Sequence, residues 1–254
     1  PLTHQPRSEE PQAVMPPGHR HIRSLGVEAP GRTYFFEYEE GPPVDGQVRL
    51  DTLYTGLSAG TELTFLKNTN PYFRSRFDRD RGVFIENEPD LHYPVPFLGY
   101  MEVARISQSR AFGLSDGALV ASAYGHKTGH TADPFHDVLV PLPNELDPLL
   151  GVLVAQMGPI CANGILHADA EAFGLHVPAL GAGVNGRPIM VIGAGTVGLM
   201  TALFVRSLGA SDVIITDPSE FRRGKADAMG LTAMTEEQGW QHVKARWHDG
   251  AMGL

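Results

Sequence analysis

Residues 187–217 read RPIMVIGAGTVGLMTALFVRSLGASDVIITD, and this stretch decides the fold of the chain's second half. The run Ile189–Ile192 is short, apolar and rich in β-branched residues, as in a strand buried on both faces of a parallel sheet. Gly193, Gly195 and Gly198 follow it in the pattern G-x-G-x-x-G. The apolar residues after the third glycine predict a buried helix. The stretch therefore predicts a strand, a glycine turn and a helix.

Each glycine has a separate physical role in such a turn. The first allows the tight turn, the second lets a pyrophosphate approach the backbone, and the third lets the helix pack close to the strand. The free N–H groups of the helix N-terminus then face the phosphates. A second strand, Val213–Thr216, ends in Asp217, about 20 residues after Gly198, where an acid can bind the ribose of NAD. The pattern predicts a dinucleotide site that comprises Gly193, Gly195, Thr196, Val197, Gly198, Asp217 and Arg222.

The same glycine pattern occurs a second time just upstream, at Gly181–Gly186. This copy precedes a strand instead of following one, and Arg187 and Pro188 stand where a helix would have to begin. A lone G-x-G-x-x-G is weak without the strand, helix and acid around it. We therefore interpret Gly181–Gly186 as a flexible loop.

The composition of the 254-residue chain excludes several classes of function. A net charge of −9 argues against nucleic acid or an anionic membrane as the main partner. The single cysteine, Cys161, excludes an internal disulfide framework and a Cys₄ zinc site. The sequence has neither an apolar run long enough to cross a bilayer nor a signal-peptide core. We expect a soluble, cytoplasmic α/β protein.

The chain divides, by its pattern, into an arm and two domains. Residues 1–23 are predicted as a mobile N-terminal arm, because residues 1–18 are polar and rich in proline. Residues 24–146 carry short β segments punctuated by glycine and proline, which favours a barrel-like β domain. The segments expected as strands are 32–38, 47–54, 94–106, 119–124 and 136–141, with a short helix at 63–67. Residues 68–92 read as a charged loop.

Residues 147–254 are predicted as a linking helix followed by a dinucleotide-binding domain. The helix begins at Asp147-Pro148, runs to about Ala168 and is kinked or interrupted at Pro159. Further helices are expected at 218–229 and 235–247. A doubly wound domain has about six strands in two halves, and only the first half is visible. The sequence therefore predicts either a fragment or a sheet completed by something else.

This order of domains resembles the medium-chain dehydrogenase/reductase superfamily, which has the zinc alcohol dehydrogenase fold. The residues that carry the resemblance are G-A-G-T-V-G at 193–198, Asp45-Gly46-Gln47-Val48, Ser58–Glu62 and Phe97–Tyr100. It covers roughly residues 24–250. It implies a β-rich GroES-like barrel domain followed by a partial Rossmann parallel α/β domain, a small-molecule substrate and a homodimer.

The chain departs from the zinc-dependent members at their metal ligands. The cysteine of the first loop falls on Ala59, and the histidine of Gly-His-Glu falls on Tyr100; a third ligand could fall on Cys161 or near Gly158. Catalytic zinc needs about three protein ligands. We therefore expect no metal site. The resemblance is to the zinc-less branch, and Ser58–Glu62 with Gly-Tyr in place of Gly-His looks similar to the bacteriochlorophyllide dehydrogenase-like group.

Three residues are implied as catalytic by the resemblance: Thr61, Tyr100 and Glu62. Thr61 aligns with the family's proton-passing Ser/Thr, or is only a turn residue. The phenol of Tyr100 could donate to a substrate carbonyl or fill the vacated metal space. Glu62 aligns with a carboxylate behind the zinc and could orient a neighbour. His126 and His130, in a glycine-containing loop, are weaker candidates for acid/base work or a metal.

Two functional hypotheses follow. The first is a zinc-independent NAD(P)-dependent oxidoreductase that transfers a hydride to or from a carbonyl/alcohol or an activated alkene. The alternative is a non-catalytic dinucleotide-binding protein, redox-responsive or interacting, on a dehydrogenase scaffold. Asp217 favours NAD because a carboxylate repels a 2′-phosphate, while Arg222 and Arg223 leave NADP open.

Overall fold

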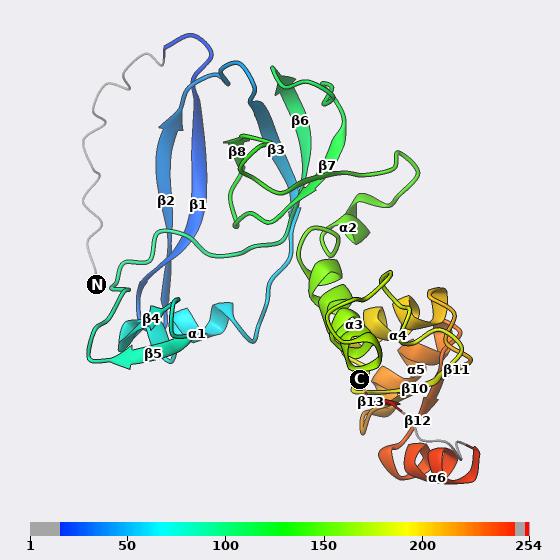
Figure 1. Ribbon diagram of the computed structural model, residues 1–254. Coiled ribbons are helices and arrows are strands. Elements are labelled where there is room, and N and C mark those ends of the chain that lie inside the picture. Colours follow the sequence, from blue (N-terminus) through cyan, green and yellow to red (C-terminus); the bar gives the residue numbers. More distant parts are fainter. Residues whose placement is uncertain (1–15, 247–251, 254) are drawn as a thin grey trace, which may run out of the picture. The chain divides into compact units, whose positions relative to one another are not determined.

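The computed structural model describes residues 16–246 and 252–253 (Figure 1). The chain divides into two compact units between Val152 and Leu153. The predicted arm at residues 1–15 and the predicted helix end at Trp247 lie outside the described residues.

The first unit is built mainly from antiparallel strands. Its five-stranded sheet has the order β8-β3-β6-β7-β9, and two hairpins, β1-β2 and β4-β5, stand beside it. The elements in chain order are β1 (Arg20–Ala29), β2 (Arg32–Glu40), β3 (Val48–Thr55), α1 (Glu62–Leu66), the 3-10 helix η1 (Pro71–Phe73), β4 (Ser75–Asp78), β5 (Val83–Glu86), β6 (Glu102–Ser109), β7 (Leu119–Ser122), β8 (Gly129–Ala132), β9 (Leu139–Pro141) and α2 (Pro148–Gly151).

Alternation along the strands places the core of this unit. In β3, Val48 and Leu50 are fully buried, and they pack with apolar residues of the strands on either side. The buried members of this cluster are Val48, Leu50, Ala104, Ile106, Val120 and Ala132. A smaller cluster of Val27, Val95 and Leu98 joins β1 to the segment before β6. A strand with one buried face alternates in this way.

Arg20 ties the β1-β2 hairpin to the sheet. Its guanidinium lies 2.8 Å from Glu40 in β2 and 2.6 Å from Asp51 in β3. Strand β1 begins at Arg20, which pairs with Glu40 in the ladder with β2, so the prediction of an arm that reaches residue 23 is wrong at its end. The sequence signal was weak because charged and apolar residues alternate irregularly before Ser24.

The second unit is a parallel sheet of order β12-β11-β10-β13. Its elements are α3 (Met157–Phe173), β10 (Pro188–Ile192), α4 (Thr196–Ser207), β11 (Asp212–Thr216), α5 (Glu220–Ala228), β12 (Thr232–Met234), α6 (Glu236–Arg246) and β13 (Met252–Gly253). Numbered in chain order, the strands lie 3-2-1-4, which is the three-stranded first half of a doubly wound dinucleotide fold with one strand of the second half beside it. The predicted partial Rossmann domain is confirmed.

The predicted linking helix is two helices. Helix α2 is capped by Asp147, whose carboxylate accepts a hydrogen bond from Leu149 N at 2.9 Å, and it ends at Gly151. Helix α3 starts at Met157, so Pro159 lies in its first turn, where a missing N–H costs nothing. The predicted helix is therefore interrupted, but at residues 152–156 just before Pro159 and not at Pro159 itself.

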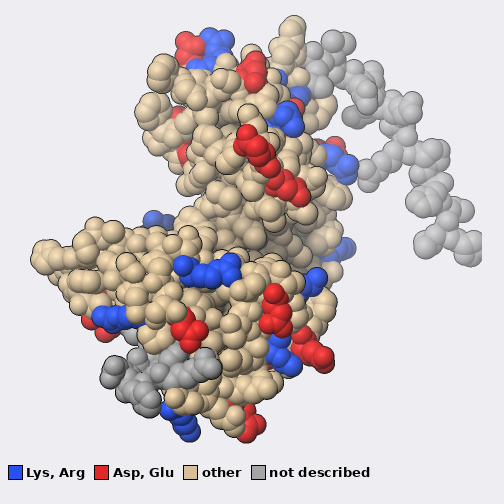
Figure 2. Space-filling model, turned by 90° about the vertical axis from the view of Figure 1, so that its right-hand side faces the viewer, with Lys and Arg blue, Asp and Glu red and all other residues tan. Residues whose placement is uncertain are grey.

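The charged side chains are intermixed on the surface. On the face shown in Figure 2, Lys and Arg lie among Asp and Glu without a continuous basic patch. Within the described part of the chain, no helix is long and apolar enough to cross a bilayer.

Candidate functional site

The glycine turn between β10 and α4 has the geometry that its sequence predicts. Gly193 has a φ of +100°, which an L side chain rarely adopts. A Cβ added at Gly198 would overlap the carbonyl oxygen of Gly193, so the helix start lies directly against the end of β10. A Cβ at Gly195 would instead meet nothing within 4 Å. The first and third glycines are needed by the protein, and the second faces open space.

The N-terminus of α4 is open to a ligand. Gly195 is its N-cap, and among the described residues no side chain caps it. The first N–H groups of a helix carry partial positive charge and point away from the helix. A phosphate group fits this position.

Asp217 lies at the end of β11, next to this turn. Its side chain is only 2% exposed. One carboxylate oxygen accepts from Ser219 N at 2.8 Å and the other from Ala194 N at 2.9 Å. These backbone N–H groups and the nearby Arg222 lower the pKa of Asp217 against the effect of burial. The carboxylate thus remains charged and fastens the glycine turn to β11.

The two arginines that follow have different contacts. Arg222 lies 3.6 Å from the Asp217 carboxylate and is largely exposed. Arg223 donates to the carbonyl oxygens of Asp217 and Pro218, at 2.8 and 2.9 Å. Arg223 therefore caps the strand end, while Arg222 is the more adaptable cation.

The upstream copy of the glycine pattern, Gly181–Gly186, is a loop, as expected, but hydrogen bonds hold it against helix α3. The N–H groups of Gly181 and Gly183 donate to the fully buried carboxylate of Asp169 in α3, at 2.6 and 2.7 Å. Val184, in the same loop, is fully buried in the core of the unit. The glycines serve packing against α3, and the interpretation as a flexible loop is wrong in this respect.

A hydrogen-bonded cluster in the first unit centres on Glu62 and His126. Glu62 is the first residue of α1, is 2% exposed and lies 2.6 Å from Nε2 of His126. Its other carboxylate oxygen accepts from Ser58 N at 2.7 Å. Nδ1 of His126 lies 2.7 Å from the hydroxyl of Thr55. The imidazole is thereby held by a buried carboxylate on one side and a hydroxyl on the other.

Close backbone packing brings His126 to this place. The N–H of His126 donates to Leu98 O at 2.7 Å. Gly99, with a φ of +93°, would place a Cβ 2.9 Å from the nitrogen of His126, and Gly125 would place one 2.5 Å from Leu98 O. Glycine is therefore required on both sides of this contact. Sequence reasoning ranked His126 below Glu62, because only the fold brings their distant segments together.

Thr61 and Tyr100 also approach each other, but loosely. The phenol of Tyr100 lies 3.5 Å from the hydroxyl of Thr61, at the exposed edge of the cluster. Thr61 is the N-cap of α1, yet its side chain makes no capping hydrogen bond. All three residues predicted as catalytic thus lie in one region of the first unit, with His126 as a fourth member.

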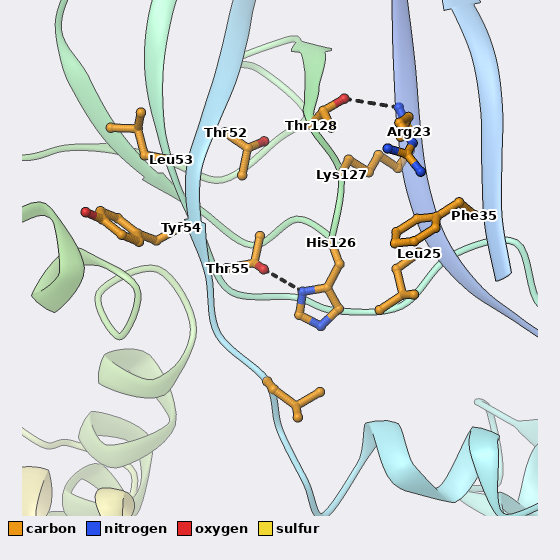
Figure 3. A pocket seen from close by; sticks show the side chains of 11 residues that line it. Arg23, Leu25, Phe35, Thr52, Leu53, Tyr54, Thr55, His126, Lys127 and Thr128 are labelled. Atoms are coloured by element: carbon orange, nitrogen blue, oxygen red, sulfur yellow. Dashed lines mark hydrogen bonds between the residues drawn. The ribbon is translucent and has the colours of Figure 1, made fainter. Parts of the chain in front are cut away.

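A pocket of about 570 Å³ opens next to this cluster (Figure 3). Its walls come from β1, β2, β3 and the segment between β7 and β8. The lining residues are Arg23, Leu25, Phe35, Thr52, Leu53, Tyr54, Thr55, Leu57, His126, Lys127 and Thr128. The pocket combines apolar walls with a few polar groups, which is typical of small-molecule sites.

Glu102 and His130 form a second buried pair in the first unit, with a carboxylate oxygen of Glu102 3.6 Å from Nδ1 of His130. Glu102 accepts hydrogen bonds from the hydroxyls of Thr52 and Ser122, and burial raises its pKa. His130 stacks on Tyr124 with ring centroids 3.6 Å apart. Burial, together with the charges of Lys127 and Arg20, lowers the pKa of His130 to about 3. His130 is a neutral core residue and does not take part in a metal site with His126.

The residues at the family's zinc positions do not match a set of zinc ligands. Ala59 offers no donor atom, and Glu62 and His126 already bind each other. Within residues 16–246, no group of three or more His, Cys, Asp or Glu side chains is placed to hold a metal ion. In the second unit, Cys161 is buried and its thiol points to Val197 O at 3.6 Å; burial raises its pKa. The donor set does not fit a catalytic zinc.

Comparisons with known proteins agree with this fold. No protein-family model matches the chain. A stretch of 93 residues, 37% of this chain, is 30% identical to the uncharacterized zinc-type alcohol dehydrogenase-like protein YdjJ of Escherichia coli K12, and it spans only 23% of that relative. Galactitol-1-phosphate dehydrogenase from Escherichia coli superposes with a TM-score of 0.63 at 18% identity, over 91% of this chain and 67% of that one.

An alcohol dehydrogenase from Escherichia coli CFT073, solved with NADH, superposes with a TM-score of 0.61 at 17% identity, over 89% of this chain and 66% of that one. The fold is that of the medium-chain alcohol dehydrogenases. The predicted pairing of a GroES-like β domain with a Rossmann-type domain is thereby confirmed. The local match to a zinc-type relative supports the medium-chain superfamily, while the zinc-less branch and the bacteriochlorophyllide dehydrogenase-like group stay predictions.

Proposed function

We propose that this chain is, or is part of, a zinc-independent NAD(P)-dependent oxidoreductase that acts on a carbonyl/alcohol or an activated alkene. One observation carries the proposal: the helix α4 N-terminus is uncapped, and Gly195 before it faces open space. A structural turn without a ligand has no need of a glycine there, since a Cβ would meet nothing.

A nicotinamide dinucleotide fits the residues around this turn. Gly195, Thr196 and Val197 supply backbone N–H groups for a pyrophosphate. The Asp217 oxygens each accept one backbone hydrogen bond and retain a lone pair for a ribose hydroxyl. When bound, the cofactor supplies or accepts the hydride, which leaves the chain to position the substrate and move one proton.

NAD is the preferred cofactor in this proposal. A charged carboxylate at Asp217 repels a 2′-phosphate, and its lowered pKa keeps it charged. Arg222 is largely exposed and offers a cation to a phosphate instead, so binding of both cofactors has to be compared. A homodimer and a cytoplasmic location stay predictions from the sequence.

Zinc independence rests on the donor set. A metal that polarises a carbonyl needs about three protein ligands and an open position. Ala59 and Tyr100 occupy two of the family's ligand positions, and Glu62 is engaged by His126. Proton transfer then falls to side chains of the first unit.

His126 can move this proton through the hydroxyl of Thr55, which lines the pocket, because both ring nitrogens are already hydrogen-bonded. The buried Glu62 carboxylate holds Nε2, and Thr55 meets Nδ1, so the ring is fixed in orientation. We assign Glu62 as the residue that positions His126. Thr61 and Tyr100 are the hydroxyl groups that could contact a substrate oxygen directly.

The test is a screen of aldehydes, ketones, quinones and enones with NADH and NADPH, run with and without a chelator. We expect turnover with at least one substrate, unchanged by the chelator, and no stoichiometric zinc by elemental analysis. Loss of turnover on chelation that added zinc restores would contradict zinc independence. Tight NADH binding that no substrate oxidises would favour the alternative, a non-catalytic dinucleotide binder.

A further inference from the structure

Lys127 is a cation inside the first unit without a carboxylate partner among the described ion pairs. Its ammonium lies 3.2 Å from the phenol oxygen of Tyr38 and 3.5 Å from that of Tyr124. The same nitrogen lies 5.2 and 4.8 Å from the centroids of these two rings. The two tyrosines therefore hold the ammonium in place through their rings and oxygens.

The surroundings do not neutralise this charge. Burial raises the pKa of Tyr38, aided by the charge of Glu40, so its phenol remains protonated. Burial also raises the pKa of Glu102, although hydrogen bonds from Ser122 and Thr52 and the charge of Lys127 act in the opposite direction; both carboxylate oxygens are thereby engaged by hydroxyls and neither is in an ion pair with Lys127. Half-buried ammonium groups are costly unless an anion accompanies them. A ligand could supply the missing negative charge.

Lys127 lies at the junction of two hollows in the surface. It lines the pocket of about 570 Å³ together with His126, and it also lines a neighbouring pocket of about 480 Å³ with Phe36, Tyr38 and Phe97. In Figure 3 the side chains of His126 and Lys127 extend from adjacent positions of one segment. The other cation of the first pocket, Arg23, already pairs with Glu37 at 3.0 Å and lies over the ring of Phe35.

The remaining walls of the pocket are apolar. Leu25, Leu53, Leu57 and Phe35 contribute side chains, and the last three of these are well exposed. A ligand with an apolar skeleton would cover these surfaces. One uncompensated cation matches a single negative charge better than a phosphate, which carries between one and two charges.

We propose that the pocket binds an apolar carbon skeleton that bears a carboxylate, with the carboxylate paired to Lys127 beside His126. This inference rests on the proposed function in one respect: it names the substrate class of an oxidoreductase whose proton passes through His126. The binding itself requires no cofactor. It can therefore be measured apart from catalysis.

The experiment compares 3-phenylpropionate with 3-phenylpropanamide, two probes of nearly equal shape that differ in charge. Their dissociation constants are measured on the full chain by NMR titration, without cofactor. We expect the carboxylate to bind about tenfold more tightly than the amide, a preference of about 1.4 kcal/mol that falls as salt is added. Lys127→Met should abolish the preference, and Lys127→Arg should keep most of it.

Equal binding of the two probes, weak or strong, would overturn the proposal, as would a preference that survives in Lys127→Met. The melting temperature of Lys127→Met shows whether this variant is folded. If it is not, the salt dependence of the parent's preference and the Lys127→Arg variant still test whether Lys127 binds the carboxylate. Failure of NADH to bind would contradict the proposed function but not this inference. Turnover without a preference for the carboxylate would contradict this inference but not the proposed function.

Discussion

Gly195 and Gly198 are three positions apart, yet the protein itself requires glycine only at Gly198. At Gly198 the protein itself leaves no room, because a Cβ would overlap the carbonyl oxygen of Gly193. At Gly195 the space is open and the φ of −80° suits any L residue. Only a bound pyrophosphate would meet a side chain there.

Two alanine variants separate these roles. Gly195→Ala should keep the parent's melting temperature and lose about tenfold or more in NADH affinity. Gly198→Ala should lose about 1–3 kcal/mol of stability from overpacking, and NADH binding with it. Thermal unfolding and fluorescence titration measure both. A Gly195→Ala variant that binds NADH like the parent would remove the main support for the dinucleotide site.

Gly224→Ala is the matched control. Gly224 lies within helix α5, where an added Cβ meets nothing within 4 Å. Alanine is the better helix former by about 1 kcal/mol. This variant should be slightly more stable than the parent and should bind NADH unchanged.

His130 predicts a pH dependence of stability. Its pKa is about 3 in the folded chain against an ordinary value of 6.5. The folded state favours the neutral ring, so this contribution to stability is present above pH 6.5. As the pH falls from 6.5 towards 3, the unfolded chain takes up a proton that the folded chain refuses, and stability is lost. One such group contributes a slope of at most about 1.4 kcal/mol per pH unit.

His130→Phe tests this slope. Phenylalanine retains a ring against Tyr124, and neither ring nitrogen of His130 has a hydrogen-bond partner among the described residues. Urea unfolding at pH 6.5, 5.5 and 4.5 should show a flatter acid limb for the variant. Glu102, whose pKa is raised, acts in the opposite direction, and it lies 3.6 Å from His130, so the difference between the two proteins reports on the buried pair. If the free energy of unfolding depends on pH in the same way in parent and variant, His130 does not have the lowered pKa.

At the scale of elements, helix α1 is short but positions a whole cluster. Its first residue, Glu62, binds Ser58 N ahead of the helix and His126 from a distant segment. Glu62→Gln retains the size and one acceptor but removes the charge. We expect kcat to fall about 10–100-fold, with little change in NADH affinity and a displaced pH–rate profile. An unchanged profile would leave Glu62 with a purely structural role.

The elements that sequence reasoning found are those with strong local patterns. The predicted strands at 32–38 and 47–54 correspond to β2 and β3, and the helix at 63–67 corresponds to α1. The predicted strand at 94–106 begins only at Glu102, because the preceding segment makes an isolated bridge from Val95 to Val27 instead of a ladder. Periodicity and glycine punctuation were sufficient where one face of a strand is buried.

The missed elements depend on contacts distant in sequence. β8 contains Gly129 and His130 and has no strand signal, yet it pairs with β3 through residues about 80 positions away. The hairpin β4-β5 lies in the stretch interpreted as a charged loop, and aromatic contacts such as Phe77–Phe84 hold it. Propensity alone does not reveal such pairings.

In the candidate site, too, only the residues that are close together in sequence could be predicted. The glycine turn and Asp217 were predictable, since strand, turn, helix and acid are contiguous in sequence. The pair of Glu62 and His126 was not, because only the fold joins two segments about 60 residues apart. Asp169 gave no local signal for its contacts with the upstream glycine loop.

At the scale of the whole molecule, the two compact units carry different parts of the proposed function. The dinucleotide turn lies in the second unit, and the polar cluster around His126 lies in the first. Ligand binding stabilises the conformation to which the ligand binds, by about 2.7 kcal/mol when the ligand is at 100 times its dissociation constant. Cofactor and carboxylate probes should therefore protect different segments of the chain.

Hydrogen exchange measured by mass spectrometry tests this separation. With NADH, peptides that cover 190–199 and 214–219 should exchange more slowly, because the ligand engages the open N–H groups of α4 and the Asp217 region. Peptides from the β4-β5 hairpin should be unchanged. With 3-phenylpropionate, protection should instead fall on residues 123–130. In Gly195→Ala, these two peptides should need about tenfold more NADH for the same protection; a parent-like concentration dependence there would mean that Gly195 does not contact the cofactor.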